Sequence, residues 1–231
     1  MRALIERLIG TFKGNPEYKL DRSYSTGQLL RIVYYRGWQY GRGLWVKIRI
    51  ASKGAVFVGR HVILHHPGQI QAGKSLILEE GVYINALAEE GVVLGNHVTI
   101  ARYAILSCTG IIAEKGKGIR IGNNSAVGAQ SFLGGQGGIR IGNDVIMGPQ
   151  VKIFSENHNY AVLDQLIRNQ GQTRKGVVIG NNCWIGAGVT ILDGSEIGDG
   201  CVIAAGAVVS GAIPANSVAM GVPARVHKQR L

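Results

Sequence analysis

The chain has 231 residues, of which 46% are hydrophobic and 35 are glycines, enough for one large domain with a continuous core. Its 25 Lys and Arg against 14 Asp and Glu give a formal net charge of +11. No apolar run approaches the ~20 residues of a membrane-spanning helix, and the glycines do not recur at every third position as in collagen. Charged Glu6 and Arg7 interrupt the apolar start, so we expect no signal peptide and a cytoplasmic protein.

The N-terminal segment, residues 1–50, differs from the rest of the chain in charge and pattern. Residues 1–60 contain twelve Lys or Arg and three acidic residues. Apolar residues at helical spacing predict a short amphipathic helix that stops near Gly10–Gly14, and a second helix from about Thr26 to Trp45. No nucleic-acid-binding motif accompanies the charge, so we expect no nucleic-acid partner.

Two interpretations of residues 26–50 stay open. Basic side chains stand among Tyr34, Trp38 and Trp45, which suits a helix lying on an anionic membrane surface at the inner face of the membrane. Alternatively, the segment closes the open end of the following domain and buries these aromatic rings there.

From about residue 51 the sequence turns to short strands, and then to a six-residue repeat. An aliphatic residue recurs at every sixth position in four stretches. These residues are Leu94, Ile100, Leu106; Ile121, Val127, Leu133; Ile141, Met147, Ile153; and Ile179, Ile185, Ile191, Ile197, Ile203, Val209. A period of six is a multiple of the strand period of two but not of 3.6. Hexapeptide repeats therefore predict an all-β fold, a parallel β-helix over residues 51–226, followed by a basic tail at 227–231.

Two segments interrupt the repeat. Residues 112–120 add polar chain between coils, and residues 155–178 abandon the repeat entirely. A regular solenoid that leaves its repeat for some twenty residues usually does so for function. The three cysteines have no metal-ligand spacing, and we interpret Cys108, Cys183 and Cys201 as buried, reduced thiols.

The hexads, the excursion that starts SENH, the segment NNCWIGAGVTIL and the ending IPANSVAMGVPARV resemble the left-handed β-helix acyltransferases. The resemblance is greatest to the maltose, galactoside and nodulation-type sugar O-acetyltransferases and to the polysaccharide-biosynthesis acetyltransferases. It covers residues 90–228. It implies a triangular prism with three hexads per turn, a homotrimer, and acetyl-CoA in the cleft between neighbouring prisms, with no metal.

The resemblance places the catalytic histidine of these enzymes at His158, in the string IGNDVIMGPQVKIFSENH. A sugar hydroxyl is a poor nucleophile at neutral pH, and an imidazole can accept its proton during attack on a thioester. Glu156, Asn157 or a backbone carbonyl would orient the ring. The alternative is a surface-loop histidine with local hydrogen bonds.

The resemblance also implies cofactor contacts, which fall on Trp184, Ala187, Ala205, Ser210, Gly211, Arg225 and Lys228. Small residues would expose the backbone to the pantetheine arm, and the two basic residues would bind phosphate. Where the family often has Lys this chain has Gly211, and where it has an acceptor-contacting Asn this chain has Gly128. We therefore assign acceptor binding to Gln130, Gln136 and Tyr160.

Other functions stay open beside a sugar O-acetyltransferase. An antibiotic acetyltransferase or an amino-sugar N-acetyltransferase of the same fold would use the same base and cofactor. The fold also hosts a carbonic-anhydrase-like zinc enzyme, for which His61, His65, His66 and His97 are the available ligands. A basic scaffold without catalysis is the remaining alternative.

Overall fold

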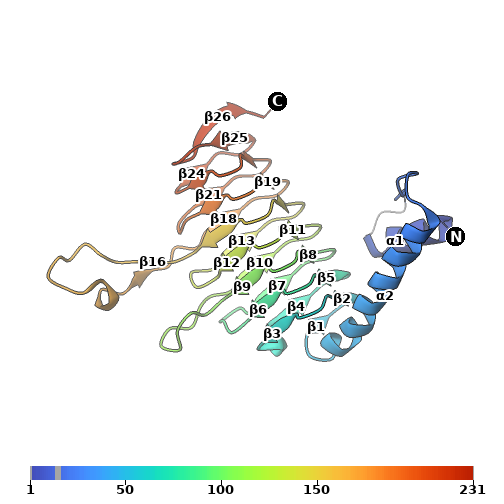
Figure 1. Ribbon diagram of the computed structural model, residues 1–231. Helices are drawn as coiled ribbons and strands as arrows, with labels where there is room; N and C mark the ends of the chain where they lie inside the picture. The colour runs from blue at the N-terminus through green and yellow to red at the C-terminus, as the bar shows by residue number, and fades with distance from the viewer. Residues whose placement is uncertain (1, 14–16, 231) are drawn as a thin grey trace.

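A computed structural model describes residues 2–13 and 17–230 of the chain. It shows a left-handed parallel β-helix with two N-terminal helices at one end (Figure 1). The parallel β-helix that the repeats predicted and the left-handed form that the resemblance implied are therefore confirmed. The β-helix is a prism with three sheet faces, which we name A, B and C in the order in which the chain visits them. Within the described residues no helix is both long and apolar enough to cross a membrane.

Successive coils add one strand to each face. Face A is formed by β1 (Ala51–Ser52), β4 (Ile70–Ala72), β7 (Val92–Leu94), β10 (Ile119–Ile121), β13 (Ile139–Ile141), β18 (Val177–Ile179), β21 (Glu196–Ile197) and β24 (Ala212–Ile213). Face B is formed by β2 (Val56–Val58), β5 (Leu76–Leu78), β8 (Thr99–Ile100), β11 (Ala126–Val127), β14 (Ile146–Met147), β19 (Trp184–Ile185), β22 (Val202–Ile203), β25 (Ser217–Met220) and β26 (Arg225–Gln229). Face C is formed by β3 (Ile63–His65), β6 (Tyr83–Asn85), β9 (Ile105–Ser107), β12 (Phe132–Gly134), β15 (Lys152–Phe154), β20 (Thr190–Ile191) and β23 (Val208–Val209).

The hexad residues stack on one another along the prism axis. On face A, for example, Leu94 pairs with Ile121, which pairs with Ile141, which pairs with Ile179. Each of these side chains is buried. The parallel register, repeated on all three faces, forms one continuous aliphatic core. The cysteines, Cys108, Cys183 and Cys201, are free, buried thiols within this core.

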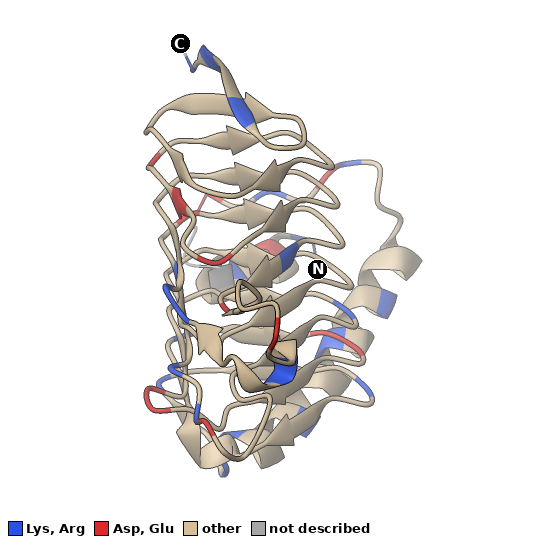
Figure 2. Cartoon of the chain, turned by 90° about the vertical axis from the view of Figure 1, so that its left-hand side faces the viewer, with Lys and Arg blue, Asp and Glu red and all other residues tan. Residues whose placement is uncertain are grey.

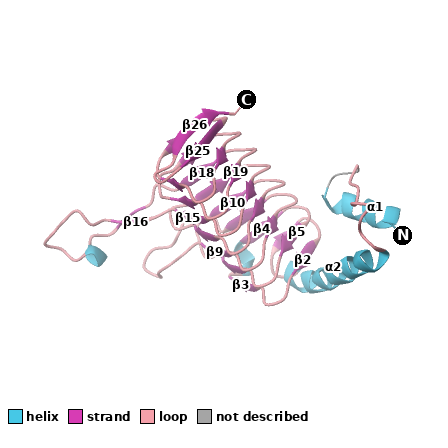
Figure 3. Cartoon of the chain, turned by 45° about the horizontal axis from the view of Figure 1, so that its top comes forward, coloured by secondary structure: helices cyan, strands magenta, loops and turns pink. Residues whose placement is uncertain are grey.

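The N-terminal helices lie at the first coils of the prism (Figures 1 and 3). They are α1 (Arg2–Lys13) and α2 (Thr26–Lys47). Helix α2 begins at a capping box in which the Ser25 side chain accepts from the Gln28 N–H and the Gln28 side chain accepts from the Ser25 N–H. It packs on β2, and Phe57 of β2 contacts the rings of both Phe12 and Tyr40. The two predicted helices are therefore present.

The side of α2 that faces the prism includes polar side chains that bond to it. The Arg36 guanidinium lies 2.9 Å from a Glu79 carboxylate oxygen, and Gln39 donates to the other oxygen at 3.0 Å. The Arg42 Nε donates to the Val58 carbonyl at 2.8 Å. Three aromatic side chains of the helix point away from the prism: Tyr34, Trp38 and Trp45 are 68%, 58% and 77% exposed. Helix α2 thus covers part of the first coils without burying the rings of Tyr34, Trp38 and Trp45 against them.

Two excursions leave the prism at the edge where face C turns into face A, the C–A edge. The first, which we name the insert (residues 108–118), connects β9 to β10. The second, the arm (residues 155–176), connects β15 to β18 and extends away from the prism (Figures 1 and 3). It contains β16 (Asn157–His158), β17 (Gln172–Thr173) and the short 3-10 helix η2 (Ile167–Asn169); a second such helix, η1 (Pro67–Gln69), precedes β4. Both excursions end before the predicted boundaries, since 119–120 and 177–178 already belong to face A.

Candidate active site

His158 lies on the arm, in a two-stranded antiparallel ribbon. It pairs with Gln172, and Asn157 pairs with Thr173. Its side chain is exposed, and among the described residues no hydrogen bond to the imidazole ring is found. Within one protomer the ring is thus free to meet a bound molecule. The predicted orienting groups Glu156 and Asn157 do not bond to it, and Glu156 bonds to Arg174 instead.

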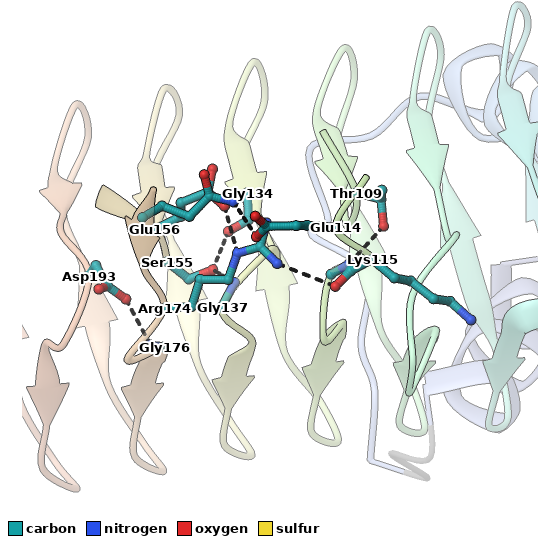
Figure 4. A network of polar contacts seen from close by, with 12 residues as sticks. Thr109, Glu114, Lys115, Gly134, Gly137, Ser155, Glu156, Arg174, Gly176 and Asp193 are labelled. Atoms are coloured by element: carbon teal, nitrogen blue, oxygen red, sulfur yellow. Dashed lines mark hydrogen bonds and ion pairs between the residues drawn. The ribbon is translucent and has the colours of Figure 1, made fainter. Parts of the chain in front are cut away.

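The root of the arm is fixed by the buried side chain of Ser155 (Figure 4). Its hydroxyl donates to the Gly134 carbonyl at 2.6 Å and accepts from the Gly137 N–H at 2.9 Å. At the other end of the arm, Asp193 accepts from the backbone N–H groups of Lys175 at 3.2 Å and Gly176 at 2.8 Å. The ribbon that carries His158 is therefore attached to the prism at both ends.

A charged cluster joins the arm to the insert (Figure 4). The Arg174 Nε donates to Glu156 at 2.7 Å, and another guanidinium nitrogen lies 3.4 Å from Glu114 of the insert. Arg174 also donates to the Lys115 carbonyl at 3.3 Å, while the Gln172 amide donates to Glu114 at 2.5 Å. We name Glu114, Glu156, Gln172 and Arg174 the arm–insert cluster. Of its members only Glu156 was considered from the sequence, since nothing in the repeat pattern brings residues 114 and 174 together.

The predicted cofactor residues fall into two groups. Trp184 lies exposed on face B, Ala187 and Ala205 lie at the edge between faces B and C, and Arg225 and Lys228 lie exposed on β26 of face B. Ser210 and Gly211 lie instead at the C–A edge, between β23 and β24. The B–C edge presents accessible backbone. A Cβ atom added at Gly188 or Gly206 would meet no heavy atom within 4 Å.

The predicted acceptor residues are divided between the same two edges. Gln136 is half-buried at the C–A edge beside the root of the arm, and Tyr160 is exposed on the arm itself. Gln130 lies at the B–C edge, where its side-chain oxygen accepts from Gln150 at 3.1 Å. In one protomer, His158, Gln136, Tyr160, Ser210 and Gly211 thus belong to one edge of the prism. Gln130, Trp184, Ala187, Ala205, Arg225 and Lys228 belong to face B or its edge with face C.

Two cavities in the described part of the chain lie away from this site. A cavity of about 580 Å³ lies between α1 and residues 18–19, and another of about 440 Å³ lies against residues 51–53, 71–73, 93–96 and 123. Neither is lined by a predicted site residue. Among residues 2–13 and 17–230, no group of three or more His, Cys, Asp or Glu side chains is placed to hold a metal ion. His97 of the sequence-predicted zinc ligands contacts the Phe12 carbonyl at 2.8 Å.

Comparison with known proteins identifies a transferase repeat. Residues 176–211 match the family model "Bacterial transferase hexapeptide (six repeats)". The chain is 30% identical over 210 residues to "Probable acetyltransferase Rv3034c" of Mycobacterium tuberculosis, covering 91% of this chain and 60% of that protein. It is 37% identical over 114 residues to the galactoside O-acetyltransferase of Escherichia coli, covering 49% of this chain and 55% of that protein. The matches thus span little more than half the length of these curated relatives.

A solved structure shows the same fold. The N-acyltransferase AntD from Bacillus cereus, in a mutant form in complex with dTDP and coenzyme A, superposes with a TM-score of 0.58 at 20% identity. The superposition covers 81% of this chain and 88% of AntD. At this identity the likeness supports the β-helix architecture.

Proposed function

We propose that this chain is a hexapeptide-repeat transferase that moves an acetyl group from acetyl-CoA to a sugar hydroxyl in polysaccharide or glycan biosynthesis. The match to the transferase hexapeptide model and the similarity to named acetyltransferases support this proposal. The observation that carries this proposal is the arm. A hexapeptide prism, which needs no such excursion to fold, carries an exposed histidine on a ribbon anchored at both ends. An anchored ribbon holds a proton acceptor at a defined place beside the prism.

The residues support direct transfer with His158 as the general base. Acetyl-CoA supplies an electrophilic thioester carbonyl when it is bound. An imidazole nitrogen of His158 accepts the proton of the acceptor hydroxyl as the oxygen bonds to the carbonyl carbon. The same proton then goes to the sulfur as the carbon–sulfur bond breaks. A backbone N–H of the glycine-rich edges stabilises the charge on the carbonyl oxygen.

The proposed cofactor contacts suit the chemistry of coenzyme A. Ala187, Ala205 and the open glycines beside them leave the backbone of the B–C edge accessible to an extended pantetheine chain. Arg225 and Lys228 are exposed on β26 and supply positive charge for phosphate groups. Trp184 presents its ring on the same face, next to the strand of Val202.

The decisive assay follows coenzyme A release from acetyl-CoA with a panel of sugars, nucleotide sugars, amino sugars and chloramphenicol. We expect a sugar hydroxyl to be acetylated and His158→Ala to lower the rate by about 10²- to 10⁴-fold. His61→Asn is the matched control, because His61 is an exposed histidine at a positive φ that asparagine also tolerates. Full activity in His158→Ala would exclude His158 as the general base. Acetylation of chloramphenicol alone would contradict the proposal that the acceptor is a sugar.

We also propose that the enzyme is a homotrimer with active sites between subunits. The proposed residues lie on two different edges of each prism, so a second prism is needed to bring the arm of one copy to face B of another. Inactive variants test this directly. Subunits carrying His158→Ala and subunits carrying Arg225→Ala, co-expressed, should form trimers in which some sites contain both parental residues. Activity in the mixture that is absent from each variant alone would support a site shared between subunits. A mixture without activity would place the site within one subunit.

A last proposal is peripheral contact with the inner face of a membrane through residues 26–50. The outward side of α2 carries Tyr34, Trp38 and Trp45, and a Cβ atom at Gly37 or Gly41 of the same helix would meet no heavy atom within 4 Å. Basic residues recur along the N-terminal helices (Figure 2). An apolar, aromatic helix side bordered by basic residues fits an anionic lipid surface.

Vesicle flotation tests the membrane contact with the full chain. We expect binding to vesicles that contain phosphatidylglycerol and little binding to phosphatidylcholine alone. Replacing Tyr34, Trp38 and Trp45 together by serine should abolish binding. Replacing the fully exposed Ile112 and Leu163 by serine is the control, since these residues lie on the insert and the arm. Equal flotation of parent and triple variant would remove the membrane proposal.

A further inference from the structure

The arm and the insert leave the prism at the same edge but on different coils. The insert follows β9 and the arm follows β15, with β12 between them on face C. The two excursions are nevertheless joined by the arm–insert cluster, in which Arg174, at 17% of its side chain, is less exposed than either of the two carboxylates it contacts. A contact between segments 58 to 60 residues apart in the chain is not required for either coil to stack.

The register of the ribbon shows which part of the arm the cluster holds. His158 pairs with Gln172, and continuing this antiparallel register places Glu156 opposite Arg174. Alternate residues of a strand lie on one face, so Glu156 and His158 share a face of the ribbon with Arg174 and Gln172. Glu114 of the insert therefore contacts the face of the ribbon that carries His158.

Glu114 contacts both residues of the return strand on this face. One carboxylate oxygen accepts from the Gln172 amide at 2.5 Å and lies 3.4 Å from the Arg174 guanidinium. Gln172 is the cross-strand partner of His158, and Arg174 is bonded to Glu156, two residues before His158. The carboxylate is thus connected to the histidine through both strands of the ribbon.

We propose that Glu114 is a positioning residue for His158: through Gln172 and Arg174 it fixes the ribbon at the angle in which the imidazole reaches the acceptor hydroxyl. This proposal rests on the proposed function, in which His158 is the general base. Glu114 itself touches no reacting atom. Its loss leaves the base present but free to sample other positions, and displacement of a catalytic group by about 1 Å can lower a rate by about 100-fold.

The test compares Glu114→Gln with Glu90→Gln. Glu90 is a matched control because its side chain is equally exposed, at 49%, and also lies near two arginines, Arg120 and Arg140, which belong to face A and not to the arm. We expect Glu114→Gln to lower kcat by about 10- to 100-fold while the KM for acetyl-CoA changes less than about 2-fold. Glu114→Asp, which keeps the carboxylate, should recover part of kcat. Glu90→Gln should behave as the parent.

Two further measurements separate positioning from general stability. Hydrogen exchange of residues 156–174 should become faster in Glu114→Gln while exchange of the face C strands is unchanged. In a cycle with Arg174→Gln, the two losses of kcat should combine to less than their product, because both variants break one linkage. Parent-level kcat in Glu114→Gln, with His158→Ala inactive, overturns the positioning role alone. Full activity of His158→Ala instead overturns the base assignment on which the role depends.

Discussion

Gly41 and Gly43 stand two residues apart on α2, and we predict opposite effects of alanine at the two positions. A Cβ atom at Gly43 would lie 1.7 Å from the Val56 carbonyl oxygen and 2.6 Å from its carbon, both backbone atoms of β2. A Cβ atom at Gly41 would meet no heavy atom within 4 Å. The same chemical change therefore tests whether α2 is seated on β2 as the structure shows.

The magnitudes follow from the geometry. Alanine is preferred to glycine in a helix interior by about 1 kcal/mol, and at Gly41 this gain should appear nearly in full. At Gly43 an ordinary contact of at least 3.4 Å requires the helix to move by about 1.7 Å. That movement breaks the 2.8 Å bond from Arg42 to the Val58 carbonyl. Overpacking at about 1 to 3 kcal/mol and one charged hydrogen bond at about 1.5 to 3 kcal/mol exceed the gain of about 1 kcal/mol, leaving roughly 1.5 to 5 kcal/mol of destabilisation.

Hydrogen exchange of residues 26–50 is the appropriate assay, because the loss is local to α2. We expect exchange slower by about 2- to 5-fold in Gly41→Ala and faster by about 10-fold or more in Gly43→Ala. Exchange of face A strands remote from the helix, such as β18, should be equal in both variants. Parent-level protection of α2 in Gly43→Ala would refute the reasoning, since the helix could not then lie against Val56.

Two further outcomes follow from buried polar groups. Ser155→Ala should lower the free energy of unfolding, measured by denaturant titration, by about 1 to 3 kcal/mol, because the Gly137 N–H loses its partner at a buried site. An unchanged free energy of unfolding would contradict this anchoring of the arm. Burial raises the pKa of the Cys108 thiol to about 12 from a usual value of 9.0. The folded chain therefore keeps this proton at pH values where the unfolded chain releases it, so the stability contribution is complete below pH 9 and is lost as the pH rises toward 12. Between about pH 8 and pH 10.5 the free energy of unfolding should fall more in the parent than in Cys108→Ala, as measured by denaturant titration at each pH. Equal decreases in the two proteins would contradict the raised pKa of the Cys108 thiol.

The sequence was sufficient to predict the prism and the position of the arm. The hexad residues predict a stack because a parallel β-helix repeats one local interaction. Each Ile or Leu, such as Ile141, meets the equivalent residue one coil later, here Ile179. The helices were also predicted from a local signal, the 3.6-residue period of their apolar residues.

The orientation of α2 could not be predicted from that period. An amphipathic pattern normally places its apolar side on the protein, but in α2 Arg36 and Gln39 face the prism because Glu79 of the adjoining coil accepts from both. The close approach at Gly43 also depends on β2, a separate element. Both determinants are contacts with another part of the chain, and no periodicity within α2 contains them.

The arm–insert cluster was missed for a related reason, and the spacing of the prism explains its composition. Strands of one face lie about 4.8 Å apart, so the arm and the insert, two strands apart on face C, are separated by about 10 Å at their roots. Two long polar side chains that meet end to end, such as Arg174 and Glu114, can span such a gap. Serine or aspartate in both places would be too short, and an apolar pair would leave the backbone carbonyl of Lys115 without the donor that Arg174 provides. A rigid repeat thus sets the distance, and long polar side chains that cross it hold the arm in place.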